Sequence, residues 1–329
     1  MSNYQPSTSS SADPNLGSLG PEYRTQVAEP ESEPVSVPHE VMLLLLAYLP
    51  LYELLAMSQV CVLLRDAVNE EVLPWLNVVV DRTLSSRLTD EILIKVTSKA
   101  NGRLATLALM DCVKITDDGL RRVAETNPLI NKLCLTGCTR LTPEGVIRAV
   151  KTLSDHHPHS LTTLQINGIY DINKHHLQTL RSFLPLNTEL QLKQPLLFYH
   201  TYRNPKSPGH WQSLRVIDVE VCRLCEEVRM VFDCPRESCK RRECRGCSFC
   251  IQRCEECGGC VEYGEEEEAA CSDVLCSACW LQLPKCDVCN KPYCKTHTSL
   301  GYSASASAGF ICDVCRAKFI QSLCDDLEF

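Results

Sequence analysis

The stretch CRGCSFCIQRCEECGGC, Cys244 to Cys260, places six cysteines within seventeen residues. A hydrophobic core does not require sulfur at this density. Three uses of the thiols compete: disulfide bonds, a redox or nucleophilic group, and metal ligation. The redox state of the compartment in which the chain folds decides between them.

The N-terminal sequence MSNYQPSTSSSADPNLGSLGPEYRTQ has neither the basic start nor the apolar stretch of a secretory signal. We therefore expect the chain in the nucleus and/or the cytoplasm, where thiols stay reduced and 23 cysteines favour metal over disulfides. The longest apolar run, Val41 to Leu49, has nine residues. A membrane-spanning helix needs about 20, so no membrane segment is expected.

The spacing of the cysteines points to zinc. Two-residue gaps between cysteines recur from Cys222 to Cys315, and Cys294 and His297 keep the same gap. Two such turns supply the four ligands of a tetrahedral ion at about 2.3 Å from each sulfur. The candidate ligands are Cys222, Cys225, Cys239, Cys244, Cys247, Cys254, Cys257, Cys260, Cys276, Cys279, Cys286, Cys289, Cys294, His297, Cys312 and Cys315.

The ligand pairing stays open at this point. Nineteen cysteines and histidines lie between Cys222 and Cys315 as possible ligands, enough for up to about four structural zinc ions with three left over. Cys234, Cys239 and Cys250 have no unambiguous partner. The last eight candidates form either a two-zinc cross-brace, if the pairs alternate, or two simple knuckles, if they follow in order. Four protein ligands leave no position for water, so these sites are expected to stabilise the fold, and no catalytic residue is predicted.

The amino-acid composition of the N-terminal part changes after residue 34. Residues 1–34 are rich in Ser, Pro and Glu and are expected to form a disordered tail. Helices are predicted from Pro38 to Pro50, from Leu51 to Val60 and from Val62 to Val72. Three helices in about 40 residues cannot bury so much Leu and Val by themselves. The excess apolar surface therefore calls for a partner.

These helices resemble the F-box over residues 36–80. The resemblance rests on the residues Pro38, Glu40, Val41, Leu45, Tyr48, Leu49, Pro50, Leu54, Leu55, Ser58, Val60, Cys61, Arg65 and Trp75. Leu64 stands where the family usually has tryptophan. The resemblance implies docking onto the Skp-type adaptor of SCF ubiquitin ligases and, through it, onto a cullin. The implied adaptor contacts are Pro38, Val41, Leu45, Leu49, Pro50, Leu54, Leu55 and Val60.

A repeat follows the F-box. Leu104–Val123 and Ile130–Ala149 align at an offset of 26 residues, which pairs Leu107 with Leu133 and Cys112 with Cys138. A period of 20 to 29 residues with L-x-L followed by cysteine is typical of leucine-rich repeats, in which neighbouring units stack to share one core. Cys112 and Cys138 are then predicted to be buried and inert.

We therefore predict a multidomain chain: a helical F-box at 35–80, a short α/β leucine-rich-repeat solenoid at 81–194, a linker at 195–220, and a small zinc-stabilised Cys-rich domain with little regular structure at 221–329. The combination resembles plant F-box proteins of the Skp-interacting-partner group. The resemblance implies a non-catalytic subunit of an SCF-type ligase that recognises an unknown protein target through the repeats and the zinc domain.

Two alternatives remain. A zinc-finger regulator would bind nucleic acid through the basic run Arg236, Lys240, Arg241, Arg242 and Arg245. The tail from Val221 holds 13 basic and 18 acidic residues, a net charge of −5, which favours a solvated surface instead. A RING-like ubiquitin ligase would act through the last knuckles. RING domains place histidine at about the fourth or fifth ligand, whereas His297 is sixth among the last eight candidates.

Overall fold

The computed structural model describes residues 44–185, 195–203, 215–239, 244–262, 264, 266–300 and 310–325. The chain divides into the units Met1–Val37 and Pro38–Phe329, and all described residues belong to the second. The predicted tail and the implied adaptor contacts Pro38 and Val41 lie outside the described residues.

The N-terminal helices follow the pattern of apolar residues. Helix α2 (Leu51–Met57) begins after Pro50, and α3 (Val62–Glu70) is followed by the 3-10 helix η1 (Leu73–Trp75). Both predicted helices are confirmed, although each ends two or three residues early. Leu64 is buried in the core, so an apolar group fills the corner where the family usually has tryptophan.

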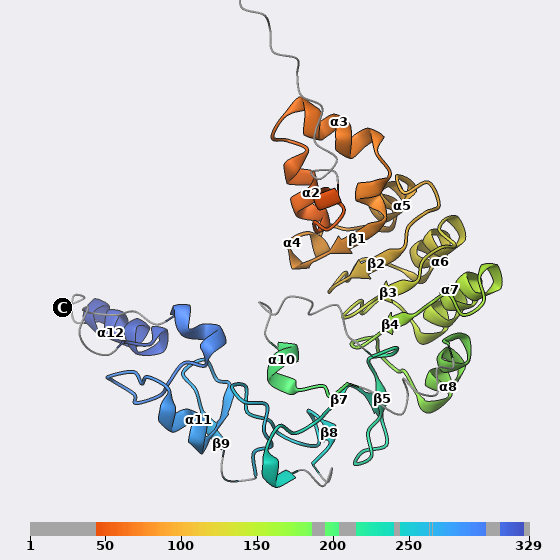
Figure 1. The fold of residues 1–329 in the computed structure, drawn as a ribbon. Coiled ribbons are helices and arrows are strands. Elements are labelled where there is room, and N and C mark those ends of the chain that lie inside the picture. The colour runs from red at the N-terminus through yellow and green to blue at the C-terminus, as the bar shows by residue number, and fades with distance from the viewer. Residues whose placement is uncertain are drawn as a thin grey trace, which may run out of the picture. The chain divides into compact units, whose positions relative to one another are not determined.

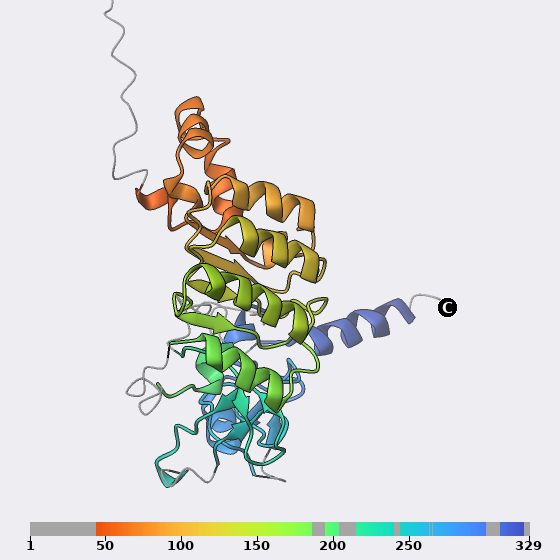
Figure 2. The same ribbon diagram turned by 90° about the vertical axis from the view of Figure 1, so that its right-hand side faces the viewer.

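A parallel sheet with strand order β1-β2-β3-β4 follows. A helix comes after each strand, and α5 to α8 lie in a row along one side of the sheet (Figures 1 and 2). The elements are β1 (Asn77–Val80), α4 (Arg82–Ser85), α5 (Asp90–Ser98), β2 (Thr106–Leu109), α6 (Asp117–Thr126), β3 (Lys132–Cys134), α7 (Pro143–His156), β4 (Thr163–Gln165) and α8 (Lys174–Phe183).

The 26-residue offset of the sequence is the register between two neighbouring strands. Leu107 of β2 pairs with Leu133 of β3, as the alignment predicts. Cys112 and Cys138 are both fully buried. Contact with Cys112 and burial raise the pKa of the Cys138 thiol far above its usual value. The prediction that these two cysteines are buried is confirmed, and a thiol held protonated in this way is a poor nucleophile.

A repeated hydrogen-bond pattern links successive helices. Asp117, the first residue of α6, accepts from the backbone N–H of Thr142 at 2.9 Å and from its hydroxyl at 2.6 Å. Thr142 in turn caps α7 by accepting from the N–H of Gly145 at 3.0 Å. Asp90 binds Thr116 in the same way one unit earlier. The repeated threonines and glycines of the sequence are therefore parts of one capping ladder.

Gly145→Ala tests this ladder. A Cβ at residue 145 would lie 2.0 Å from the carboxylate of Asp117, so the cap must shift. We expect the free energy of unfolding to fall by about 1–3 kcal/mol, measured by urea denaturation. Asp117→Ala removes the obstructing group, so Gly145→Ala should cost clearly less on that background. An equal cost on both backgrounds would contradict the ladder.

One hydrophobic core runs from the N-terminal helices through the sheet. Trp75 is buried and donates its Nε1–H to the carbonyl of Val68 at 2.7 Å, which joins η1 to α3. The same core includes Leu46, before α2, and Val219, beyond the sheet. The predicted boundary between residues 80 and 81 therefore passes through continuous packing.

The segment predicted as a linker also takes part in this core. Ile217 is buried and forms a parallel bridge with Leu164 of β4. The buried carboxylate of Asp218 accepts from the backbone N–H groups of Ile166 at 2.9 Å and Asn167 at 3.1 Å. Burial raises the pKa of Asp218 to about 6, although these two hydrogen bonds oppose the shift. Residues 215–219 thus lie beside β4, at the edge of the sheet.

The Cys-rich region is built from short elements. They are α10 (Tyr199–Arg203), β5 (Glu220–Val221), β6 (Val228–Arg229), β7 (Val231–Phe232), η2 (Glu237–Cys239), β8 (Gly246–Cys247), β9 (Glu266–Glu268), β10 (Val274–Cys276), α11 (Ser277–Gln282), η3 (Lys295–Leu300) and α12 (Asp313–Asp325). Among the described residues, no helix has the length and apolar character that crossing a membrane requires.

Candidate metal centres and adaptor-binding surface

All eighteen cysteines from Cys222 to Cys315 fall into five groups of four potential ligands, whose ligand atoms lie within 4.8 Å of one another. Four groups contain only cysteine, and the mixed group adds a carboxylate and an imidazole. The first group is Cys222, Cys225, Cys247 and Cys250; the second is Cys234, Cys239, Cys244 and Cys260; the third is Cys254, Cys257, Cys276 and Cys279; the fourth is Cys286, Cys289, Cys312 and Cys315; the mixed group is Cys271, Asp273, Cys294 and His297.

The sulfur separations fit tetrahedral ligation. Zn–S bonds of about 2.3 Å place two sulfurs of one tetrahedron about 3.8 Å apart. One pair of sulfurs is 3.9 Å apart in the first group, and such a pair is 3.6 Å apart in the second, 3.9 Å in the third and 3.7 Å in the fourth. Each all-cysteine group could therefore hold one metal ion with little movement.

One thiol in each all-cysteine group ionises readily. Burial opposes ionisation of Cys222, but the backbone N–H groups of Cys247 and Cys225 outweigh it and lower its pKa to about 6. Cys234 and Cys286 are lowered in the same way, to about 7 and about 6. The hydrogen bond from Cys257 lowers the pKa of Cys254 to about 5. Two other thiols in each group have a raised pKa, so they would lose their protons only on binding the metal.

The structure corrects two pairings suggested by the sequence. Cys244 and Cys247 form a two-residue turn, yet Cys244 belongs to the second group and Cys247 to the first. Cys276 and Cys279 join Cys254 and Cys257 upstream, so they are not the first pair of the final cross-brace. A spacing of two residues lets two sulfurs meet but does not force them to, because the chain between distant turns decides which sulfurs converge.

Sequence reasoning left four ligand candidates unassigned: Cys234, Cys250, Cys271 and Asp273. The count of nineteen cysteines and histidines left three beyond four complete sites. The structure uses all nineteen and adds Asp273 as the twentieth, which makes five groups instead of about four. The three cysteines left over were the available signal, since they needed one further ligand to make a fifth set.

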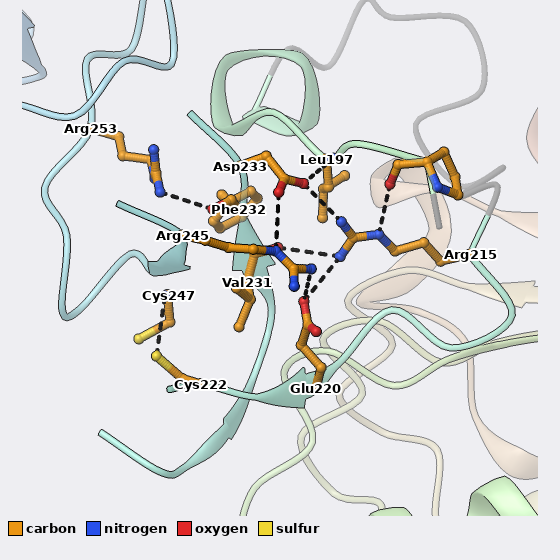
Figure 3. A network of polar contacts seen from close by, with 11 residues as sticks. Leu197, Arg215, Glu220, Cys222, Val231, Phe232, Asp233, Arg245, Cys247 and Arg253 are labelled. Atoms are coloured by element: carbon orange, nitrogen blue, oxygen red, sulfur yellow. Dashed lines mark hydrogen bonds and ion pairs between the residues drawn. The ribbon is translucent and has the colours of Figure 1, made fainter. Parts of the chain in front are cut away.

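A network of charged side chains fixes the start of the Cys-rich region (Figure 3). The buried guanidinium of Arg215 contacts Asp233 at 3.1 Å and Glu220 at 3.5 Å, and it donates to the carbonyl of Val231 at 3.3 Å. Arg245 contacts the same two carboxylates. Arg253 donates to the carbonyls of Phe232 and Cys244. These contacts hold the first and second groups against residues 215–219 at the edge of the sheet.

The same network bears on the predicted basic run. Arg245 is engaged by Glu220 and Asp233, and Arg236 lies beside the thiols of Cys276 and Cys260, which raise its pKa. Lys240, Arg241 and Arg242 lie outside the described residues. The two described arginines of the run thus have partners within the Cys-rich region.

A cavity of about 360 Å³ lies where the sheet meets the Cys-rich region. Its lining includes Tyr170 after β4, Tyr202 of α10, Arg229 of β6 and Phe232 of β7. Phe249, between Cys247 and Cys250 of the first group, completes the aromatic part of the lining. The guanidinium of Arg229 stacks over the ring of Phe249 at 4.4 Å. Among the described residues that line the cavity, none is acidic. The described lining is therefore aromatic with two arginines, of which Arg203 is paired with Glu255 at 3.4 Å.

The implied adaptor contacts divide into exposed and buried residues. Leu45 is 61% exposed and Val60 is 68% exposed, and Leu55 is also exposed. Leu49 and Pro50 are half-buried, and Leu49 packs on the core. Leu54 is only 2% exposed, so it supports the helices and cannot form a direct contact. Further apolar side chains, Leu44, Tyr48, Tyr52 and Val62, are exposed on the same segment.

Comparison with known proteins agrees with this organisation. A family model for the F-box domain matches residues 36–75, and a model described as the At3g27290 F-box protein C-terminal domain matches residues 218–288. F-box protein SKIP28 of Arabidopsis thaliana is 43% identical over 304 residues, which cover 89% of this chain and 94% of that protein. The chain belongs to the plant F-box proteins of the SKIP group.

Two further relatives from Arabidopsis thaliana share large parts of this F-box protein. F-box protein SKIP14 is 33% identical over 238 residues, 71% of this chain and 52% of its own length. F-box protein At3g27290 is 34% identical over 250 residues, 73% of this chain and 65% of its own length. F-box domains generally bind Skp-type adaptors in SCF complexes, and members of the family are typically non-catalytic subunits.

Proposed function

We propose that this F-box protein is the substrate-recognition subunit of an SCF-type ubiquitin ligase. The observation that carries the proposal is the row of exposed apolar side chains between Leu44 and Val62, on a segment that matches the F-box family. Exposed leucine, tyrosine and valine at this density favour a protein partner. The Skp-type adaptor covers them and connects the chain to a cullin.

The contribution of this chain is proximity. Holding a target beside the ubiquitin-charged enzyme makes an encounter between two molecules effectively intramolecular. No residue of the chain need form a bond to the substrate. The strand-and-helix units act as leucine-rich repeats, a short solenoid that fixes the distance between the F-box and the target-binding region.

We further propose zinc as the ion of the four all-cysteine groups. Four thiolates in tetrahedral separation select zinc over calcium or magnesium, which prefer oxygen ligands. The lowered pKa values of Cys222, Cys234, Cys254 and Cys286 favour the thiolate form that zinc requires. Bound zinc would hold together segments whose strands have only two or three residues.

The target is proposed to bind at the aromatic cavity, because residues of both the sheet and the Cys-rich region line it. A cavity of this size accommodates one or two side chains of a peptide. The guanidinium of Arg229, stacked on Phe249, and the absence of acidic groups from the described lining favour a segment that carries a carboxylate beside an apolar side chain.

Phe249→Ala tests this location. The full chain, bound to its adaptor, is used to select binders from a random peptide display library. Peptides with an acidic residue beside an aromatic one are expected to be enriched on the wild type and to lose at least tenfold in affinity for Phe249→Ala. Phe319→Ala, which removes another exposed ring, on α12, should leave affinity unchanged. Enrichment without acidic residues, or equal loss in both variants, would place the target elsewhere.

Co-expression of the full chain with a Skp-type adaptor and a cullin tests the function as a whole. The three proteins are expected to elute as one complex in size-exclusion chromatography. Elution of the chain apart from the adaptor, with its fold intact by circular dichroism, would refute the proposal.

A further inference from the structure

The mixed group joins residues from two separate segments. Cys271 and Asp273 lie in the turn before β10, and Cys294 and His297 lie at the start of η3. The carboxylate oxygen Oδ2 of Asp273 is 3.1 Å from the sulfur of Cys271, 3.0 Å from the sulfur of Cys294 and 2.9 Å from Nδ1 of His297. Four different side chains thus point at one centre.

The donor set is chemically suited to zinc. Sulfur, imidazole nitrogen and carboxylate oxygen are the three kinds of protein ligand that zinc takes, and four of them complete a tetrahedron. Zinc distances of about 2.0 Å to oxygen and nitrogen and 2.3 Å to sulfur would place Asp273 about 3.3–3.5 Å from its neighbours. A movement of the carboxylate by about half an ångström provides this separation, which one side-chain rotation supplies.

The order of the ligands along the chain gives a second, independent reason. Cys271 and Asp273 are followed by Cys286 and Cys289 of the fourth group, then by Cys294 and His297, then by Cys312 and Cys315. The mixed and fourth groups therefore alternate, as two sites of a cross-brace do. Ala270, next to Cys271, donates to the carbonyl of Pro292 at 2.7 Å, which fixes the two interleaved segments side by side.

An ordinary ion pair between His297 and Asp273 is the simpler explanation. It does not account for two cysteines that converge on the same carboxylate from segments more than twenty residues apart. With an ion pair alone, the fourth group would be the one metal site among the two interleaved groups. The matched C-terminal family region ends at residue 288, before Cys294 and His297, so that match does not contain the complete group.

We propose that Cys271, Asp273, Cys294 and His297 form a fifth zinc site, with Asp273 as a ligand. The site closes a cross-brace with the fourth group, which has the pairing that the cross-brace alternative predicted for it, whereas Cys271 and Asp273 take the place of Cys276 and Cys279 in the other site. The ion would tie the turn before β10, and with it the third group, to the segment that leads into α12. This inference stands on the mixed group itself and does not depend on the F-box assignment.

Cadmium-113 NMR of the full, cadmium-loaded chain distinguishes this site from the others. The cadmium shift falls as oxygen and nitrogen replace sulfur among the ligands. Four resonances are expected in the all-thiolate range, together with a fifth at clearly lower frequency. Native mass spectrometry of the zinc-loaded chain should count five ions. Four resonances and four ions would overturn the proposal while leaving the four all-cysteine sites intact.

Two variants of Asp273 provide a second test of the site, which does not depend on counting ions in the wild type. Asp273→Ala should remove the fifth resonance or shift it, and Asp273→Cys should keep the ion while moving its resonance toward the all-thiolate range. Asp287→Ala, which alters an exposed aspartate near the fourth group, should leave all five unchanged. A fifth resonance that is the same in wild type, Asp273→Ala and Asp273→Cys would exclude Asp273 as a ligand.

Discussion

Chelation of the metal is expected to unfold the Cys-rich region while the strand-and-helix units stay folded. Under reducing conditions, a chelator should expose residues 222–315 to limited proteolysis and leave residues 77–184 resistant. Each structural zinc contributes on the order of 10 kcal/mol to a small zinc domain, which is comparable to the whole stability of a typical domain. Mass spectrometry of the fragments locates the first cleavage sites.

The physical reason is the composition of the small cores. The core around Leu275 includes Cys254, Cys276 and Cys294, and a neighbouring core consists of Cys222, Val231 and Cys247. Without an ion, these sulfurs make only weak contacts. The units around β2 and β3 instead bury leucine, isoleucine and valine and need no metal.

A single substitution should reproduce part of the effect. Cys254→Ser is expected to lower the bound zinc by one ion and to open the third group first. Cys61→Ser replaces an exposed thiol outside the groups and should change neither the metal content nor the cleavage pattern. A chain that keeps its wild-type cleavage pattern after all metal has been removed would contradict the assignment of structural zinc.

Leu45→Asp combined with Val60→Asp is expected to abolish binding to the Skp-type adaptor. Both side chains are well exposed, so the substitutions leave the core intact, but each would place an unpaired carboxylate in an apolar interface. A loss of about 2 kcal/mol at each position corresponds to roughly a thousandfold weaker affinity. Isothermal titration calorimetry with the purified adaptor measures this change.

Ile92→Asp is the matched control for this variant. Ile92 is an exposed apolar residue on α5, outside the F-box. It should retain wild-type affinity, and all three chains should melt at similar temperatures. Adaptor affinity that survives in the double variant would show that the exposed segment from Leu44 to Val62 is not the docking surface.

The parts of the fold that depend on local pattern were predictable. The helices α2 and α3 follow the spacing of leucine and valine between prolines, and the 26-residue offset predicts the pairing of Leu107 with Leu133. Burial of Cys112 and Cys138 follows from the same repeat. These features are set by residues close in sequence or by identical units, so periodicity alone reveals them.

The sequence also shows which residues resemble the F-box family. It does not show which of these residues are exposed. Leu54 and Leu55 are neighbours in the same motif, yet the first is buried in the core and the second faces outward. The core continues from the F-box through Trp75 into the sheet. That burial depends on contacts with distant strands, which no local motif encodes.

Spacing and periodicity alone predict that the cysteines are placed as metal ligands, that repeated units stack, and that the apolar helices near the start exceed what they can bury. Which cysteines lie together is visible only in the folded chain, because ligand pairing depends on where distant segments cross and not on spacing. Asp273 is the clearest case: its carboxylate has no motif of its own and becomes a candidate ligand only because Cys271, Cys294 and His297 converge on it.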